Sequence, residues 1–461
     1  MWKFPTKWPI WRRTRPGEKK LLCLIEEEKE REAAAIVERL RGENELDLEA
    51  IELFVRSTML KAGAKVLEAF LEFALAEQQA PVCAENHLPK TMAATGKREK
   101  KIHSILGSSL LRRNRYVCSV CGAVRYPADE ALGVVGTGFS PGARRMMARA
   151  GSKESFAESA ADLAVFADLK VDAKDVERVA ENTGRVVDDW MAREGTRARL
   201  AAPDNEEIET LYVSFDGTGV PMRPEELAET RGKAPDGKAK TREVKLGCVF
   251  TQTTTDKEGK PVRDEASTTY VGAIENSVDF GHRIHAEAMR RAMAGAKRAV
   301  VITDGARYNK SIIDEHFPDA IRILDLYHAR EYVADFAQNT CLLPLDGSFH
   351  QECHALLDQG DIAPLIKKME SRLPRSGPRR KEGINQIGYF RENARFMRYG
   401  EFREMGLFVG SGVIEAGCRS VIGQRLKRSG MFWSERGANA IIALRCCFAS
   451  GRFEQFWEDT A

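Results

Sequence analysis

Residues 211–222 read LYVSFDGTGVPM. The first five are β-formers, the sixth is Asp216, and glycines follow at positions 217 and 219 before a proline. This pattern predicts a buried strand that ends in a turn at Asp216. Open α/β sheets bind their ligands beyond the carboxyl ends of the strands. Asp216 is therefore the first candidate site residue.

Two further acids stand in comparable surroundings. In AVVITDG (299–305), a β-branched run again leads to an aspartate, Asp304, before a glycine. Glu415 lies in GSGVIEAGCRSVIGQRLKRSG (410–430), which is helical in character after its first glycines. A single Asp before Gly is usually only a turn residue. The repeated context nevertheless favours one cluster of Asp216, Asp304 and Glu415.

Such a cluster would bind metal. At about 4 Å and an effective dielectric constant of about 20, two carboxylates repel by roughly 4 kcal/mol. Oxygen ligands select hard cations, Mg²⁺ or Mn²⁺. Two such ions can activate a water or a 3′-hydroxyl and stabilise the leaving oxygen in a displacement at phosphorus. We expect Asp216 to bridge both ions, with Asp304 and Glu415 binding one each.

Composition narrows the class of protein. The chain has 461 residues and 43% apolar content, which is enough for several globular domains. Its 71 basic and 68 acidic residues give a net charge of +3, which does not by itself indicate a polyanionic partner. No signal peptide or membrane-spanning run is recognisable. We therefore expect a cytoplasmic, nucleoid-associated protein with reduced cysteines, some of them metal ligands.

The pattern of elements predicts an α+β multidomain protein. From residue 209 onward the order is strand, strand, strand, helix, strand, helix, strand, which is expected of a ribonuclease-H-like α/β domain with a mixed sheet. The expected domains are 1–80 (basic, aromatic tail and helical region), 81–130 (zinc-ribbon-like module), 131–200 (helix-turn-helix-like region), 205–340 (first part of the catalytic core), 341–400 (helical insertion) and 401–461 (C-terminal helical part of the core).

The 81–130 region contains a candidate zinc site. Cys118 and Cys121 form a Cys-x-x-Cys pair followed by glycine, a spacing that lets two thiolates bind one ion. The other two ligands would be Cys83 and His87. A metal-free β-hairpin module with spare thiols is the alternative.

Three parts of the chain are candidates for DNA contact. Residues 1–20 interleave cations with tryptophans, which suits phosphate contact and base stacking but also describes a basic disordered tail. Within 140–192, two helices with a cap at Asp172 fit a helix-turn-helix whose recognition helix begins near Lys174, or an ordinary helical hairpin. The candidate DNA-binding cations, which would otherwise be solvated surface residues, are Lys233, Lys238, Lys240, Arg242, Arg419, Arg425, Lys427 and Arg428.

Several stretches together resemble the ISKra-type family of bacterial insertion-sequence transposases, which are DDE enzymes related to the Mutator-like superfamily. They are FDGTGVPM, DGKAKTREVKLGCVF, VITDGA, DLYH and GSGVIEAGCRSVIGQRLKRSGMFWSERGANAIIALR. The resemblance runs from about Pro81 to Trp457. It implies a ribonuclease-H-like domain with a helical insertion, acting on DNA ends with divalent metal through Asp216, Asp304 and Glu415.

The resemblance also bears on the accessory residues. Asp325 and His328 match the family's D-x-x-H signature, whose implied role is to shape the site or handle a nucleotide near the cut. His328 on its own would be interpreted as a structural histidine. Asn86 stands where the family usually has a cysteine, so either His87 replaces that ligand or the zinc has been lost.

The implied function is DNA transposition. The protein would bind the terminal inverted repeats of its element, cut strands at the ends, and join 3′-hydroxyls to target DNA with two Mg²⁺ or Mn²⁺ ions. Holding two ends together predicts a homodimer or larger homo-oligomer. The alternatives are a ribonuclease-H-fold nuclease that cuts without joining, and a non-catalytic DNA-binding protein derived from a transposase.

Overall fold

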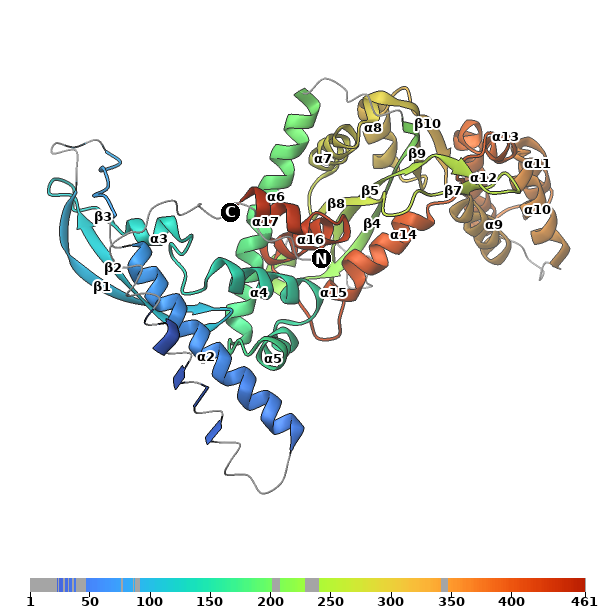
Figure 1. Ribbon diagram of the computed structural model, residues 1–461. Helices are drawn as coiled ribbons and strands as arrows, with labels where there is room; N and C mark the ends of the chain where they lie inside the picture. Colours follow the sequence, from blue (N-terminus) through green and yellow to red (C-terminus); the bar gives the residue numbers. More distant parts are fainter. Residues whose placement is uncertain are drawn as a thin grey trace. The chain divides into compact units, whose positions relative to one another are not determined.

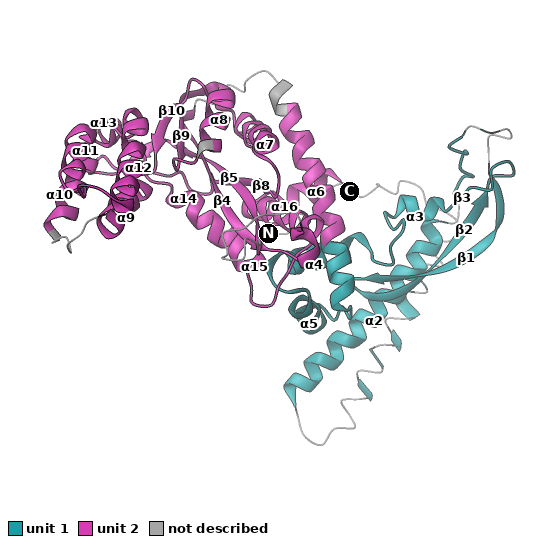
Figure 2. Cartoon of the chain, turned by 180° about the vertical axis from the view of Figure 1, so that it is seen from behind, with its two compact units in different colours: residues 1–180 teal, residues 181–461 magenta. Residues whose placement is uncertain are grey.

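The computed structural model (Figure 1) describes most of the chain. The N-terminal tail, Asn86, Lys233 and Lys238 lie outside the described residues. The residues not described are 1–22, 24, 28–29, 32, 35–36, 39–46, 76–77, 86, 88–91, 201–207, 229–239, 341–346 and 461. The chain forms two compact units, 1–180 and 181–461 (Figure 2). No helix in the described ranges is both long and apolar enough to cross a bilayer.

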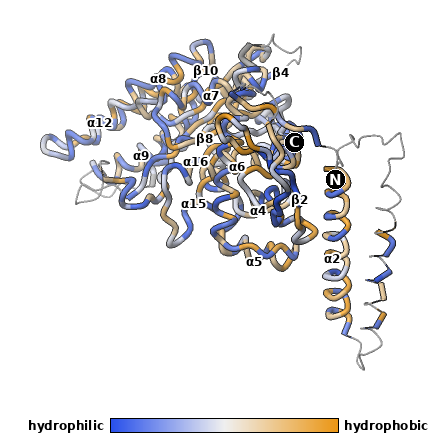
Figure 3. Tube along the Cα trace, turned by 90° about the vertical axis from the view of Figure 1, so that its left-hand side faces the viewer, coloured by the Kyte–Doolittle hydropathy of each residue, from blue (hydrophilic) through white to orange (hydrophobic). Residues whose placement is uncertain are grey.

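The first unit contains a long helix, a β-hairpin module and a set of shorter helices. Asp47 caps the helix α2, along which hydrophobic and hydrophilic segments alternate (Figure 3). The strands β1 and β2 pair antiparallel, and β3 adds to β2. The elements are α2 (Leu48–Ala74), β1 (Ala93–Ser104), β2 (Gly107–Val117), β3 (Val124–Arg125), α3 (Pro127–Ala131), α4 (Pro141–Lys153) and α5 (Phe156–Ala167).

The two helices expected within 140–192 are present as α5 and α6 (Ala173–Leu200). The chain leaves α5 through Asp168 in the left-handed conformation. Asp172 accepts a hydrogen bond from the backbone N–H of Asp175 at 2.7 Å, as expected of a helix cap. The helix pair and its cap are therefore confirmed, whereas DNA contact by this pair stays a prediction.

The division between the units falls inside α6, not at the polar segment near residue 200. Val176 and Val179 belong to the apolar core of the first unit. Further along the helix, Trp190 is buried in the second unit, where its ring N–H donates to Asp459 at 3.3 Å. The C-terminal half of α6 therefore belongs to the second unit.

The second unit is built on a mixed five-stranded sheet in the order β10-β9-β4-β5-β8. The strands β4, β9 and β10 run parallel, and β5 is antiparallel to both of its neighbours. The strands are β4 (Ile208–Pro221), β5 (Thr241–Gln252), β8 (Thr269–Ala273), β9 (Ala296–Thr303) and β10 (Ile321–Leu324), with a separate short pair β6 (Thr254–Thr255) and β7 (Pro261–Val262). The protein is α+β, as predicted.

Helices surround this sheet, and a further group of helices precedes the segment that carries Glu415. Their assignment as an insertion in a catalytic core stays a prediction. Around the strands are α7 (Ser277–Arg290), α8 (Arg307–His316) and α9 (Leu326–Thr340). The further group contains α10 (Gly347–Gln359), α11 (Ile362–Glu370), α12 (Pro378–Asn393) and α13 (Tyr399–Glu404). The chain then continues through α14 (Gly412–Gly417), a π-helical segment (Cys418–Gly423), α15 (Gln424–Leu426), α16 (Glu435–Ala449) and α17 (Phe453–Asp459).

Different helices cover the two faces of the sheet. Leu211, Val213 and Phe215 pack with apolar residues of α7 and α8 in one core. Strand side chains alternate between faces, so Asp216 points to the opposite side. That side is covered by α14, whose Gly417 lies against Leu246 of β5. The alternation thus directs Asp216 towards the helix that carries Glu415.

The prediction that the strand ends at Asp216 is wrong. β4 continues to Pro221, with Asp216 paired to Leu246 of β5. A Cβ atom at Gly217 would stand 2.4 Å from a carboxylate oxygen of Glu243, and one at Gly219 would stand 2.9 Å from the hydroxyl of Thr241. The glycines therefore permit close packing inside a strand and do not form a turn.

Candidate functional site

Three aspartates align at the carboxyl edge of the parallel strands. Ser214 of β4 pairs with Ile302 of β9, which pairs in turn with Ile323 of β10. The residues two positions further along the three chains are Asp216, Asp304 and Asp325. Because parallel strands advance together from a common register, these acids occupy equivalent positions at one edge of the sheet.

Asp216 lies half-buried in a strongly negative environment. One carboxylate oxygen accepts the backbone N–H of Gly217 at 2.7 Å, and the thiol of Cys418 lies 3.9 Å from the other. Burial raises the pKa of Asp216, and the negative charges of Asp304 and Glu415 raise it further. The hydrogen bond from the N–H of Gly217 and the nearby charge of His328 lower this pKa. The three predicted acids thus share one electrostatic environment.

Asp304 is fixed at the start of α8. Its carboxylate accepts the backbone N–H of Ala306 at 3.1 Å and the side-chain amide of Asn309 at 2.5 Å. The next residue, Gly305, lies against Tyr389 of α12, since an added Cβ would stand 2.4 Å from the tyrosine ring. The helix α12 therefore contacts the backbone directly beside Asp304.

A hydrogen-bond network links Asp325 to Glu415. The Asp325 carboxylate is fully buried and accepts from the backbone N–H of His328 at 2.7 Å, from its ring Nδ1 at 3.2 Å and from the N–H of Ser411. The Ser411 hydroxyl donates to Glu415 at 2.7 Å. Ligand atoms of Asp325, His328 and Glu415 all lie within 4.8 Å of one another. The D-x-x-H pair is thus part of the acid cluster.

This network shifts the pKa values of both Asp325 and His328. Burial acts to raise the pKa of Asp325, but its hydrogen bonds from His328 and Ser411 lower it overall. The hydrogen bond from Asp325 raises the pKa of His328 from 6.5 to about 9, against the opposing effect of burial. His328 is consequently a cation at neutral pH in the metal-free protein.

The raised pKa of His328 predicts a pH-dependent stability. The His328–Asp325 pair contributes fully below pH 6.5, and its contribution is lost as the pH rises through about 9. In EDTA, the free energy of unfolding of the wild-type protein should fall between pH 6.5 and about 9 as this pair is lost. In the His328→Gln variant this fall should be smaller by about 1 to 3 kcal/mol, allowing for solvent screening. Urea unfolding at a series of pH values measures it. Equal slopes for the variant and the wild-type protein would contradict it.

The predicted DNA-binding cations divide into accessible and inaccessible side chains. Lys240, Arg419 and Lys427 are exposed, and Arg428 is half-buried. Lys427 also donates to the Thr218 hydroxyl. These positions are compatible with the predicted phosphate contacts, which stay predictions.

One of these predicted contacts needs correction, and a second residue already has a partner within the chain. Arg425 is fully buried, with its guanidinium 5.0 Å from the centre of the Trp433 ring and Nη1 3.4 Å from the Met431 sulfur, so it cannot reach DNA. Arg242 lies in β5, is half-buried and forms an ion pair with Glu435, and DNA contact by this residue stays a prediction. The neighbouring sequence did not indicate that Arg425 packs against Trp433 or that Arg242 pairs with Glu435.

A second candidate metal site lies in the hairpin module of the first unit. The sulfur of Cys83 is 3.5 Å from Nδ1 of His87 and 3.7 Å from the sulfur of Cys121, and the sulfur of Cys118 is 3.6 Å from the same nitrogen. Tetrahedral zinc bonds of about 2.3 Å to sulfur and about 2.0 to 2.1 Å to nitrogen separate the ligands by roughly 3.5 to 3.8 Å. Each of the four ligand atoms is thus at a zinc-binding separation from at least one other, and all four lie within 4.8 Å of one another.

The electrostatics of Cys118 also suit a metal. Backbone N–H groups of Cys121 and Val120, together with the side chain of His87, lower the pKa of Cys118 to about 6. A thiolate at neutral pH is the form that binds zinc. His87 lies within this group, which agrees with the hypothesis that it replaces a cysteine as ligand.

Sequence reasoning missed several residues of the acid site. Ser411 precedes Glu415 by one helical turn, a spacing that marks it as a possible partner. Asn309 follows Asp304 in the first turn of a predicted helix. Cys418 and Tyr389 carried no comparable local pattern, because they approach Asp216 and Gly305 only through tertiary packing.

Comparisons with known proteins do not place this chain in a family. No protein-family model matches the sequence, and no curated protein matches it. Among solved structures, the chain is similar to the Drosophila P element transposase strand transfer complex, with 10% sequence identity, coverage of 72% of this chain and 84% of that chain, and a TM-score of 0.26. This TM-score does not establish a shared fold. The resemblance to ISKra-type transposases stays a prediction.

Proposed function

We propose that the protein is a DNA transposase of the kind encoded by ISKra-type insertion sequences. The observation that carries this proposal is that Asp216 and Asp304 occupy equivalent positions on adjacent parallel strands and that Glu415 of α14 lies near enough for its charge to raise the pKa of Asp216. The sheet has its first strand at the centre, one antiparallel neighbour and two parallel strands on the other side. This order supports a ribonuclease-H-like catalytic domain, and the helices of 347–404 constitute its insertion.

The acid cluster has the ligand chemistry of a divalent-cation site. Carboxylate oxygens predominate, and such ligands prefer Mg²⁺ or Mn²⁺. The raised pKa of Asp216 reflects burial and uncompensated negative charge, which bound cations would relieve. Asp216 would bridge two ions, while Asp304 and Glu415 would each hold one. When bound, these ions supply Lewis-acid activation of a nucleophilic oxygen and of the leaving oxygen at phosphorus.

The other residues of the site position these ligands. Ala306 and Asn309 orient the carboxylate of Asp304. Ser411 orients Glu415 and is itself held by the buried Asp325. His328, a cation at neutral pH, faces this network and would either bind metal as a neutral imidazole or donate to a phosphate oxygen of the DNA.

The first unit would recognise DNA ends. We propose that Cys83, His87, Cys118 and Cys121 hold one structural zinc ion, which would order the turns on which these residues lie. Together with α5 and α6, this module would bind terminal inverted repeats. Two DNA ends require at least two copies of the chain, so the active species is proposed to be a homo-oligomer.

Strand-transfer reactions test the proposed function directly. Purified protein is incubated with Mg²⁺, target DNA and a duplex that carries a pre-cut 3′ end from the element flanking the coding sequence. A joined product supports a transposase. Hydrolysis without joining would identify a nuclease, and binding without either reaction would identify a non-catalytic DNA-binding protein.

A further inference from the structure

The loop between α11 and α12, taken together with the first turn of α12, has an unusual distribution of charge. Residues 371–381, SRLPRSGPRRK, contain no acid. In the part of the chain that the structure describes, none of the five cations in this loop forms an ion pair, and all but Arg380 are exposed. These cations are Arg372, Arg375, Arg379, Arg380 and Lys381. We call this segment the basic loop.

Several cations elsewhere in the same helical region form ion pairs with acids. Arg330 pairs with Asp358 at 2.7 Å, and Arg403 pairs with the same carboxylate at 3.0 Å. Lys368 and Arg391 form ion pairs with glutamates. The basic loop therefore differs from its surroundings, and its charge is available for an anionic partner outside the chain.

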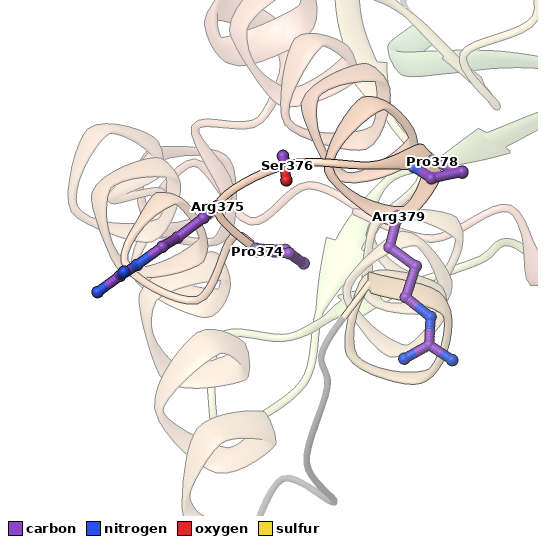
Figure 4. Close-up of a pocket in the computed structure, with 5 residues that line it drawn as sticks. All are labelled: Pro374, Arg375, Ser376, Pro378 and Arg379. Atoms are coloured by element: carbon purple, nitrogen blue, oxygen red, sulfur yellow. The ribbon is translucent and has the colours of Figure 1, made fainter.

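The shape of the basic loop favours an extended partner. Arg380 donates to the Pro374 carbonyl at 2.9 Å, and Gly377 adopts a left-handed φ of 92°, which together fix the loop. A hollow of about 670 Å³ is lined by Pro374, Arg375, Ser376, Pro378 and Arg379. In Figure 4 the side chains of Arg375 and Arg379 diverge, Arg375 towards the lower left and Arg379 downwards. Guanidinium groups that diverge in this way can bind separate phosphates along a nucleic-acid backbone better than they can bind one small anion.

The helix α12 connects the basic loop to the acid site. Arg379 lies in its first turn, and Tyr389, ten positions later, contacts Gly305 beside Asp304. Ten residues of α-helix span about 15 Å. A DNA duplex rises about 3.4 Å per base pair, so 15 Å corresponds to about four or five base pairs.

We propose that the basic loop binds the phosphate backbone of the substrate duplex about four or five base pairs from the bond that is cut. This assignment rests on the proposed function, because it takes the acid cluster as the place of cleavage. The loop would hold the duplex while the acid cluster acts on one phosphate. It adds affinity and fixes how much DNA the enzyme needs on that side of the cut.

The test combines DNA binding with substrate truncation. The triple variant Arg372→Gln/Arg375→Gln/Arg379→Gln is compared with wild type and with the control Arg391→Gln, whose arginine is already paired with Glu370. Binding is measured in EDTA across a range of salt concentrations, with duplexes shortened one base pair at a time on either side of the cut site. Cleavage is then measured with Mg²⁺ at saturating DNA.

The triple variant should bind long duplexes at least about tenfold more weakly, with a salt slope smaller by about two to three. Wild-type affinity should fall when the duplex is shortened to fewer than about four base pairs on one side, and the triple variant should not show that step. An unchanged salt slope, or a slope that changes only with RNA, would overturn the proposal. Wild-type protein that binds DNA but never cleaves it would instead overturn the proposed function.

Discussion

Asp304→Asn is expected to reduce Mg²⁺-dependent strand cleavage and joining by at least about 10³-fold, a loss of about 4 kcal/mol in transition-state stabilisation. The amide is nearly isosteric with the carboxylate and can still accept the N–H of Ala306. It removes the negative charge that would hold one cation. DNA affinity in EDTA should stay within about twofold of wild type, because binding at the phosphate backbone does not require this charge.

A matched control separates this effect from a general disturbance of α8. Asp314 lies on the same helix, is largely exposed and is 3.7 Å from Arg322. Asp314→Asn should retain wild-type cleavage within about twofold, because Asp314 is not among the acids whose charges act on Asp216 and an amide oxygen can still face the largely buried Arg322. Joining at the wild-type rate by Asp304→Asn would refute the assignment of this residue.

The second large effect is expected at the zinc site. Wild-type protein should contain one zinc ion per chain, and Cys118→Ser should contain almost none, because the hydroxyl is a poor substitute for a thiolate. Structural zinc contributes about 10 to 16 kcal/mol of binding free energy in zinc-finger peptides, so the hairpin module should also lose its protection from proteolysis. Elemental analysis and limited proteolysis measure the two effects.

Cys23 provides the control for the zinc prediction. It is an exposed thiol of the same unit and is not among the four grouped ligands. Cys23→Ser should keep full zinc content and an intact module. A wild-type protein purified without any metal in this site, or a Cys118→Ser variant that retains stoichiometric zinc, would contradict the assignment of the zinc ligands.

The acids at the sheet edge could be predicted from the sequence because their signals are local. A β-branched run before Asp304 defines a strand without reference to any other part of the chain. The same reasoning misplaced the end of the strand at Asp216. Gly217 and Gly219 are interpreted locally as a turn, whereas their actual role is to make room for Glu243 and Thr241 of the neighbouring strand.

Tertiary contacts account for the other differences. Arg425 follows Val421 and Ile422 by one helical turn, so it shares their buried side, although its sequence neighbours suggested a basic surface. The approach of Tyr389 to Gly305 joins segments more than eighty residues apart. The spacing of apolar residues along the sequence does not indicate such a long-range contact. The division of α6 between two units was hidden because the helix itself is continuous.

The most direct test of the two-cation carboxylate site is anomalous diffraction from crystals of the full chain grown with Mn²⁺ and a pre-cut DNA end. Two manganese peaks are expected, with Asp216 bound to both, Asp304 to one and Glu415 to the other. A single peak held by Asp325, His328 and Glu415 alone, or no peak within bonding distance of Asp216 and Asp304, would contradict this assignment.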